Sequence, residues 1–156
     1  MTKKSLLSFS HRIAGAIALL MLLIFWFSTV ITELMGNVDY IKNVKSCIPY
    51  GFILLIPALM IVGGTGFKLA GKSQKPVLQK KKKRMPFIAF NGLVLLIPCA
   101  FYLRYLAIHE QFDLVFLFIQ IIELIVGGIN IALLILNVKA GLQLVKNKQV
   151  KTSKYI

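Results

Sequence analysis

Polar side chains recur at regular intervals inside the last apolar segment of the chain, residues 112–138. In chain order, and counting one small residue with them, they are Gln120, Glu123, Gly127, Asn130 and Asn137. Their intervals of 3, 4, 3 and 7 residues place them on one face of an α-helix. Amide and carboxyl groups need hydrogen-bond partners, which lipid cannot supply, so this face is predicted to point into a helical bundle. We call it the polar seam.

Glu123 is the seam residue with the widest range of chemistry. It follows the start of its segment by 11 residues, which is about 16 Å at the helical rise of ~1.5 Å per residue. A carboxyl group at that depth is protonated, paired or in contact with water. Either it hydrogen-bonds to Gln120, Asn130 or Asn91 and holds helices together, or it serves as a proton or cation site or bonds a ligand.

Four apolar segments must position these residues. They cover residues 13–34, 48–70, 86–108 and 112–138, and about 20 apolar residues suffice to cross a bilayer as a helix. The chain is 58% hydrophobic and 15% charged, whereas soluble domains carry about 25% charged residues. The sequence therefore predicts an all-α integral membrane protein, a single domain over residues 1–156 folded as an antiparallel four-helix bundle.

Positive charge is concentrated on one side of the predicted membrane. The 19 Lys and Arg residues outnumber the 5 Asp and Glu residues, which gives a net charge of +14. Most of the positive residues lie in the N-terminal tail, in a basic loop predicted for residues 71–85 and in a basic tail over residues 139–156. The positive-inside rule therefore places both termini in the cytoplasm.

The expected partner of this positive charge is the anionic lipid headgroup and not nucleic acid, because the basic residues flank apolar segments. The residues predicted to bind headgroups are Lys68, Lys72, Lys75, Lys80, Lys81, Lys82, Lys83 and Arg84.

The opposite side of the membrane carries few positive residues and most of the acidic ones. Lys42 and Lys45 are predicted to lie there, ahead of the second segment and its start at Ile48. Glu33 and Arg104 are expected at similar depth near this face, and an ion pair between them is predicted. The alternative is that Arg104 extends its guanidinium to the outer headgroups.

The stretch from Gly66 to Ser73, GFKLAGKS, matches the P-loop pattern G-x-x-x-x-G-K-S. A working P-loop follows a β-strand and opens a helix, so that free backbone N–H groups face the phosphates. Here the first glycine ends an apolar helix, and Pro76 with a run of lysines follows where a new helix is required. No nucleotide cofactor is therefore expected. Gly63, Gly64 and Gly66 are predicted instead to let a neighbouring helix pack close.

Two histidines are predicted at opposite membrane faces, His11 at the cytoplasmic face and His109 at the outer face. The bilayer separates them by about 30 Å, so one chain cannot place both on a single haem. The residues around His11 read Ser-Phe-Ser-His-Arg-Ile-Ala-Gly, from Ser8 to Gly15. This stretch resembles the S-I-x-H-R-x-T-G sequence that opens the first span of succinate dehydrogenase cytochrome b subunits.

That resemblance implies a quinone site at Ser8 and Arg12, with His11 between them. A hydroxyl and a guanidinium suit a quinone carbonyl because both donate hydrogen bonds. Haem b is the other cofactor that the resemblance suggests. Members of that family have three spans and a haem-ligating histidine in the second, whereas four segments are predicted here with no histidine inside any of them.

Over its full length the chain resembles a family of uncharacterised bacterial membrane proteins with four spans. The shared features include the His-Arg pair that opens the first span, the run from Phe25 to Val30, the Gly-Gly-Thr-Gly-Phe-Lys end of the second span and an inward Glu in the fourth. The resemblance implies the topology and a bacterial inner membrane, and it implies no activity.

Three functions remain open at this stage, and no catalytic residue is predicted. The first is a redox-linked membrane subunit that contacts quinone or haem b through Ser8, His11 and Arg12. The second is a small permease or proton-coupled carrier that uses the seam. The third is a non-catalytic subunit or assembly factor, with a homo-oligomer or a larger membrane complex as its setting. The sequence shows neither a metal-ligand cluster nor a hydrolase triad.

Overall fold

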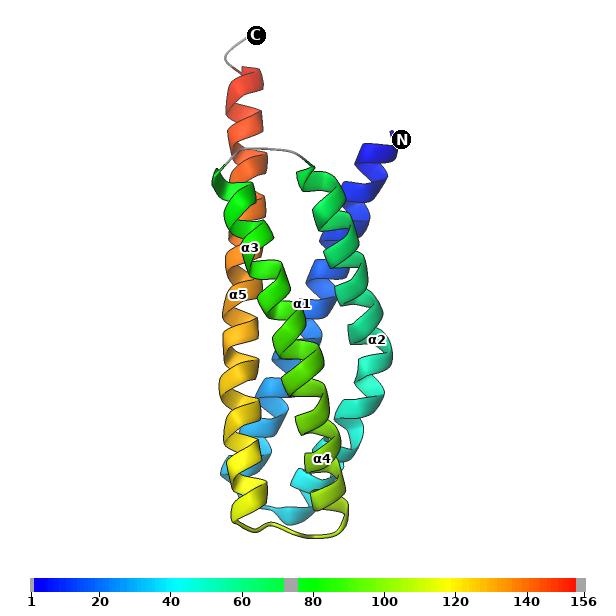
Figure 1. Cartoon of the computed structure of the whole chain (residues 1–156), viewed down its shortest axis with the longest axis vertical. Helices are drawn as coiled ribbons and strands as arrows, with labels where there is room; N and C mark the ends of the chain where they lie inside the picture. Colours follow the sequence, from blue (N-terminus) through cyan, green and yellow to red (C-terminus); the bar gives the residue numbers. More distant parts are fainter. Residues whose placement is uncertain (1, 72–75, 154–156) are drawn as a thin grey trace.

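Each apolar segment lies within a helix that is longer than the segment itself. The computed structural model describes residues 2–71 and 76–153. Its elements are α1 (Lys3–Met35), α2 (Val38–Ala70), α3 (Pro76–Phe90), the π-helical turn η1 (Asn91–Leu96), α4 (Ile97–Ile108) and α5 (Leu114–Ser153). All of the regular structure in the described ranges is helical. The helix α1, the helix α2, the continuous rod of α3, η1 and α4, and the helix α5 run alternately up and down, and both termini lie at the same end of the bundle (Figure 1).

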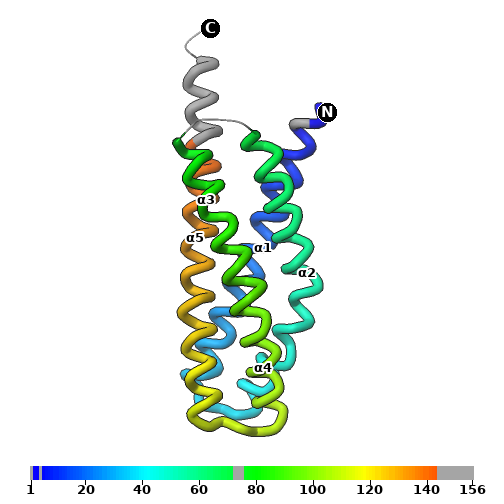
Figure 2. The backbone as a smooth tube through the Cα atoms, viewed as in Figure 1, coloured from blue at the N-terminus to red at the C-terminus, as the bar shows by residue number. Residues whose placement is uncertain are grey.

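The elements α3, η1 and α4 follow one another without a break and form one long rod (Figure 2). The π-helical turn between them changes the backbone hydrogen bonds from the i+4 to the i+5 register, as the bond from the Ile97 N–H to the Gly92 carbonyl shows. Pro98 follows directly, at the start of α4. Proline has no N–H to donate, so a change of register just before it leaves fewer backbone groups without partners.

The first turn is closed by local chemistry at Gly36 and Asn37. Gly36 adopts a φ of 63°, which glycine accepts without a Cβ clash, and donates its N–H to the Glu33 carbonyl to end α1. The Asn37 side chain then accepts from the N–H groups of Asp39 and Tyr40 and starts α2. Because two residues suffice, α1 and α2 become tightly paired neighbours.

The turn between α4 and α5 lies at the same end of the bundle (Figure 1). Asp113 starts α5 by accepting from the N–H groups of Val115 and Phe116, each at 3.0 Å. A salt bridge of 2.9 Å from Lys42 on α2 to Glu110 ties the two turns together. The hydrogen bond and the positive charge of Lys42 hold the pKa of the Glu110 carboxyl below its usual value.

The two ends of the bundle carry opposite charge. What we call the acidic end holds Glu33, Asp39, Glu110 and Asp113. What we call the basic end holds the start of α1, the end of α5 and, among its described cations, Lys68, Lys80, Lys81, Lys82, Lys83 and Arg84.

The core is built from the inward faces of all four rods. Ala18 and Leu103 are fully buried, and Leu22, Phe52 and Leu134 belong to one cluster of buried side chains between the rods. The closest helix contact pairs α1 with α2, where a Cβ on Gly51 would come within 2.3 Å of the Phe25 ring. Only a glycine lets that ring lie against the α2 backbone, which is why these two helices pack so closely.

The helices extend beyond the predicted segments in several places, and the reason is the same each time. The helix α2 begins at Val38 and not at Ile48, and α3 begins at Pro76, so most of the predicted loop 71–85 is helical. The predicted tail 139–156 is helical as far as Ser153. Hydropathy marks only the part of a helix that suits hydrocarbon, whereas these helices continue into polar sequence at both ends of the bundle.

In the described ranges, four helical stretches are long and apolar enough to cross a membrane. They are Ser5–Met35, Val38–Ala70, Pro76–Ile108 and Leu114–Gln143. Large apolar side chains cover much of their outward surface, with Ile53 and Phe118 among them. The all-helical bundle predicted from the sequence is therefore present.

Candidate functional site

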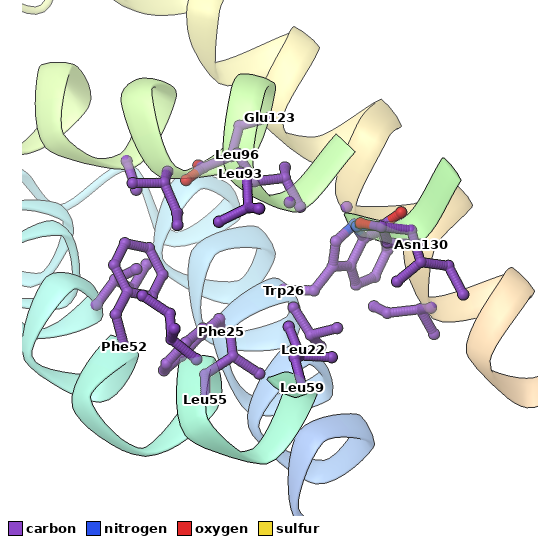
Figure 3. A pocket seen from close by; sticks show the side chains of 18 of the residues that line it. Leu22, Phe25, Trp26, Phe52, Leu55, Leu59, Leu93, Leu96, Glu123 and Asn130 are labelled. Atoms are coloured by element: carbon purple, nitrogen blue, oxygen red, sulfur yellow. The ribbon is translucent and has the colours of Figure 1, made fainter. Parts of the chain in front are cut away.

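A cavity of about 290 Å³ lies in the middle of the bundle (Figure 3). All four rods line it, and its wall is almost entirely apolar. Leu22, Phe25 and Trp26 come from α1, and Phe52 and Leu55 come from α2. Ligand pockets in proteins usually measure about 300–1,000 Å³ and are mostly apolar with a few placed polar groups. We refer to this space as the central cavity.

The central cavity opens sideways between α2 and η1. No Cα atom of α2 lies within 8 Å of a Cα atom of η1 in the described chain. Met60 on α2 and Leu93 on η1 both line the cavity, yet they are 72% and 60% exposed. Residues that line a cavity and also face outward mark its mouth. This mouth opens on the apolar flank of the bundle and away from its polar ends.

Gly63 lies at the mouth and leaves it unobstructed. It lines the cavity, and a Cβ placed on it would meet no atom within 4 Å. Gly64 also has open space around its Cβ position, but it does not line the cavity. The predicted close packing of these two glycines against a neighbouring helix is therefore wrong, whereas a Cβ on Gly66 would come within 3.3 Å of His11.

Trp26 forms the wall of the cavity on the α5 side. Its Nε1 donates to the Leu124 carbonyl at 3.0 Å, so the indole is fixed by a hydrogen bond across helices. A Cβ on Gly127 would come within 3.3 Å of the Trp26 ring, and one on Gly128 within 3.7 Å of its nitrogen. The glycine pair in α5 therefore makes room for the indole.

Glu123 lies at the acidic side of the cavity and forms a salt bridge with Lys45 of α2, with Nζ 2.5 Å from Oε2. Lys45 is 1% exposed, and Gln120 donates from Nε2 to the same carboxylate oxygen at 3.5 Å. Lys45, which precedes the predicted second segment, thus lies in α2 with its side chain inside the bundle. Glu123 was predicted to be protonated, paired or in contact with water, and in the structure it is paired. Its partner, Lys45, is a residue that hydropathy placed between the first and second segments.

The polar seam continues through Asn130 toward the basic end. Asn130 is 2% exposed, accepts from Asn91 at 3.3 Å and donates to the Ile88 carbonyl at 3.4 Å. These contacts join α5 to α3 and η1, at the point where the backbone hydrogen bonds change from the i+4 to the i+5 register. The hydrogen bond considered between Asn91 and Glu123 is absent from the described residues, and Asn91 bonds Asn130 instead.

The interior of the bundle leaves some acceptors without partners among the described residues. Asn137 donates to the Met85 sulfur at 3.6 Å, but its Oδ1 is buried and unbonded. Gln120 Oε1 and Glu33 Oε1 are likewise buried without a hydrogen bond. Buried polar atoms of this kind are rare in proteins and point to a missing partner.

The predicted outer ion pair between Glu33 and Arg104 is wrong. The described residues form two salt bridges, and neither contains these residues. Arg104 instead donates from Nη2 to the Tyr50 hydroxyl at 3.2 Å and lies 5.1 Å from the centre of that ring. Arg104 and Glu33 do lie near the same end, but the rotation of α4 turns the arginine toward α2.

The three residues predicted to bind a cofactor do not converge. His11 Nδ1 lies 2.9 Å from the Thr65 hydroxyl, and its Nε2 lies 3.1 Å from Lys81 Nζ. Arg12 is exposed and donates to the backbone carbonyl of Ser8 at 3.4 Å. None of the three lines the central cavity. Both imidazole nitrogens are engaged by the protein, so this arrangement does not present His11 to a haem iron.

The residues predicted to bind lipid headgroups are divided by their environment. Lys72 and Lys75 lie outside the described residues. Lys68, Lys80 and Lys83 are exposed, whereas Lys82 donates to the Gly71 carbonyl. Lys81 differs from them because it points inward to His11.

The described part of the P-loop pattern, Gly66 to Gly71, has a defined place, whereas Lys72 and Ser73 lie outside the described residues. Gly66 to Ala70 form the last turns of α2, and the Gly71 N–H donates to the Phe67 carbonyl at 3.1 Å. These backbone N–H groups are thus used within the helix and cannot form a phosphate cradle. A helix does begin at Pro76, contrary to expectation, but no strand precedes the pattern in the described chain.

Comparisons with protein families, with curated proteins and with solved structures found no match. The features of the chain that indicate its function are the central cavity, the Lys45–Glu123 pair and the charge at the two ends.

Proposed function

We propose that the chain is a multi-pass protein of a bacterial inner membrane, with both termini in the cytoplasm. Four helices of sufficient length and the apolar outer surface support insertion. The basic end carries the excess of Lys and Arg that favours the cytoplasmic side. Fusing a fluorescent or alkaline phosphatase reporter to the C-terminus tests this orientation, because the first is active inside the cell and the second outside.

The function that we propose is binding of a lipophilic molecule drawn from the bilayer into the central cavity. The observation that supports it most directly is an apolar cavity of about 290 Å³ whose mouth, at Met60 and Leu93, faces the flank of the bundle. A molecule dissolved in the membrane reaches such a mouth without passing through water. Isoprenoid quinones belong to this class of molecule, so the cavity replaces Ser8, His11 and Arg12 as the quinone site that we propose.

Paired glycine substitutions test this function. Gly63→Leu extends a side chain into the mouth, whereas Gly64→Leu places the same side chain on the same helix away from the cavity. The purified proteins are extracted, and the co-purified lipids and quinones are identified by mass spectrometry. We expect the wild-type protein and Gly64→Leu to retain one class of lipophilic molecule and Gly63→Leu to lose most of it. Equal retention by both variants would remove this function.

A second candidate, a proton-coupled carrier, is favoured by the buried Lys45–Glu123 pair. Paired charges inside a membrane bundle commonly mark the path of an ion or a proton. Replacing Glu123 with Gln removes the titratable group and retains its shape. Proton flux into liposomes should fall to the background level in this variant, and unchanged flux would exclude the carrier.

A further inference from the structure

Lys81 at the basic end contacts the side chain of a histidine, which distinguishes it from the exposed lysines of the same end. Lys81 of α3 lies 3.1 Å from His11 Nε2, and His11 Nδ1 lies 2.9 Å from Thr65 Oγ1. The Thr65 hydroxyl donates in turn to the Ile61 carbonyl. An ammonium can only donate, so Nε2 accepts, Nδ1 carries the hydrogen, and the positive charge of this cluster resides on Lys81.

The Lys81 charge has no acidic partner at its end of the bundle. All five acidic residues of the chain lie toward the acidic end, with Glu123 the nearest of them along α5. Within the described residues, the acceptor of Lys81 is the neutral ring of His11. As far as the described residues are concerned, two N–H groups of the ammonium are left for a further acceptor, and a negatively charged acceptor is favoured.

The cluster adjoins the central cavity on two helices. Thr65 follows the cavity residue Gly63 by two positions on α2. On α3, Lys81 precedes the cavity residue Ile88 by seven positions, which corresponds to about 10 Å of helix. A single molecule with a charged head and an apolar chain can therefore contact Lys81 while its chain enters the mouth between α2 and η1.

We infer that the chain binds one anionic phospholipid, with its phosphate on Lys81 and one acyl chain in the central cavity. This inference rests on the proposed function and specifies its ligand. A free phosphate ion satisfies the cation but leaves the apolar cavity unused. A lipid with no net charge fills the cavity but leaves the ammonium without its counter-ion. Of these three occupants, the anionic lipid alone accounts for both features.

The test uses the full-length protein in detergent, stripped of lipid and then mixed with phosphatidylglycerol or with phosphatidylcholine of identical chains. Native mass spectrometry counts the bound lipid. We expect the wild-type protein to prefer phosphatidylglycerol roughly tenfold, which is the size of one charge-assisted hydrogen bond. Lys81→Gln should reduce this preference to about twofold or less, and Lys42→Gln, which removes the same charge at the acidic end, should leave it unchanged. Lys81→Arg keeps the charge and should retain the preference, which excludes misfolding as the cause.

The glycine pair separates the two proposals. Gly63→Leu should lower the binding of both lipids alike, and Gly64→Leu should lower neither. If the wild-type protein binds both lipids equally while Gly63→Leu still releases them, the cavity function stands and the assignment of Lys81 is overturned. If neither glycine variant changes lipid binding, the proposed function falls and this inference with it. If millimolar inorganic phosphate displaced the lipid, and if Gly63→Leu did not change this displacement, Lys81 would be a site for a free anion. That result would overturn the inference.

Discussion

The acidic and basic ends of this bundle use charge in opposite ways. At the acidic end, Lys42 pairs with Glu110, and Lys45 pairs with Glu123 just inside the bundle. The two turns are capped by their own side chains, so this end is closed by interactions within the chain. At the basic end, Lys81 contacts a histidine and no acid.

This difference indicates which end needs a partner. Internal ion pairs are satisfied whatever surrounds the protein, whereas unpaired cations bind whatever anions the membrane offers. The acidic end should therefore govern stability, and the basic end should govern the response to lipid. Substitutions at each end can break this division or sharpen it.

The largest effect is expected at the Lys45–Glu123 pair. Lys45→Met leaves a buried carboxylate and Glu123→Gln leaves a buried ammonium, and breaking a buried pair in this way costs about 3–5 kcal/mol. The double variant Lys45→Met, Glu123→Met removes both charges and should lose less stability than either single variant. Reversible unfolding in detergent measures the three differences. Single variants that unfold like the wild-type protein would show that the pair is not buried in solution.

The next effect is expected where α1 meets α2. Gly51→Ala brings a Cβ into the Phe25 ring and should cost about 1–3 kcal/mol by overpacking. Gly64→Ala is the matched control, because its Cβ meets no atom and the change should stabilise the helix by roughly 0.5–1 kcal/mol. The same unfolding measurement gives the change in the free energy of unfolding of each variant. Changes of the same sign in the two variants would contradict this packing.

A smaller effect is expected at the basic end. In a neutral detergent, Lys81→Gln removes one hydrogen bond to His11 and should cost no more than about 1.5 kcal/mol. Adding phosphatidylglycerol should then raise the melting temperature of the wild-type protein more than that of the variant. A loss of stability as large as that of Lys45→Met would erase the distinction between the two ends.

The smallest effect concerns the exposed salt bridge between Lys42 and Glu110. Lys42 lowers the pKa of Glu110, so the stabilisation is fully present above the ordinary value of 4.5 and is lost as the pH falls through the lower pKa of the folded state. Lys42→Met should raise that pKa toward 4.5. Carboxyl NMR titration measures it, with Lys68→Met at the basic end as a control. An unchanged pKa of Glu110 would show that this salt bridge does not form in solution.

The sequence was sufficient to predict the helical bundle and the inward face of α5. Both follow from composition and period, which are properties of single segments. It was also sufficient, in principle, to find Lys45, because Ile41, Lys45, Ile48 and Phe52 continue one helical face ahead of the apolar segment. That signal was hidden because hydropathy ends the segment at the first charged residues.

Other features depend on relations between segments and could not be predicted. Arg104 and Glu33 were paired by their depth, but depth does not fix the rotation of a helix about its axis, and Arg104 faces Tyr50 instead. The central cavity is a space that the packed side chains of four rods leave unfilled, so no single residue signals it. The contact of His11 with Lys81 joins residues 70 positions apart and likewise appears only in the folded chain.

The π-helical turn at Asn91–Leu96 determines how α3, which precedes it on the same rod, is rotated about the axis of that rod. Such a turn is equivalent to one inserted residue, and one residue corresponds to about 100° of rotation in an α-helix. With a regular helix in its place, the stretch that carries Lys81 would be turned by roughly a quarter of a circle and the ammonium would leave His11. The single extra residue of the π-helical turn therefore fixes the rotation of α3 that brings Lys81 to the same side as the cavity mouth. The hydrogen bond from Asn91 to Asn130 holds this turn against α5.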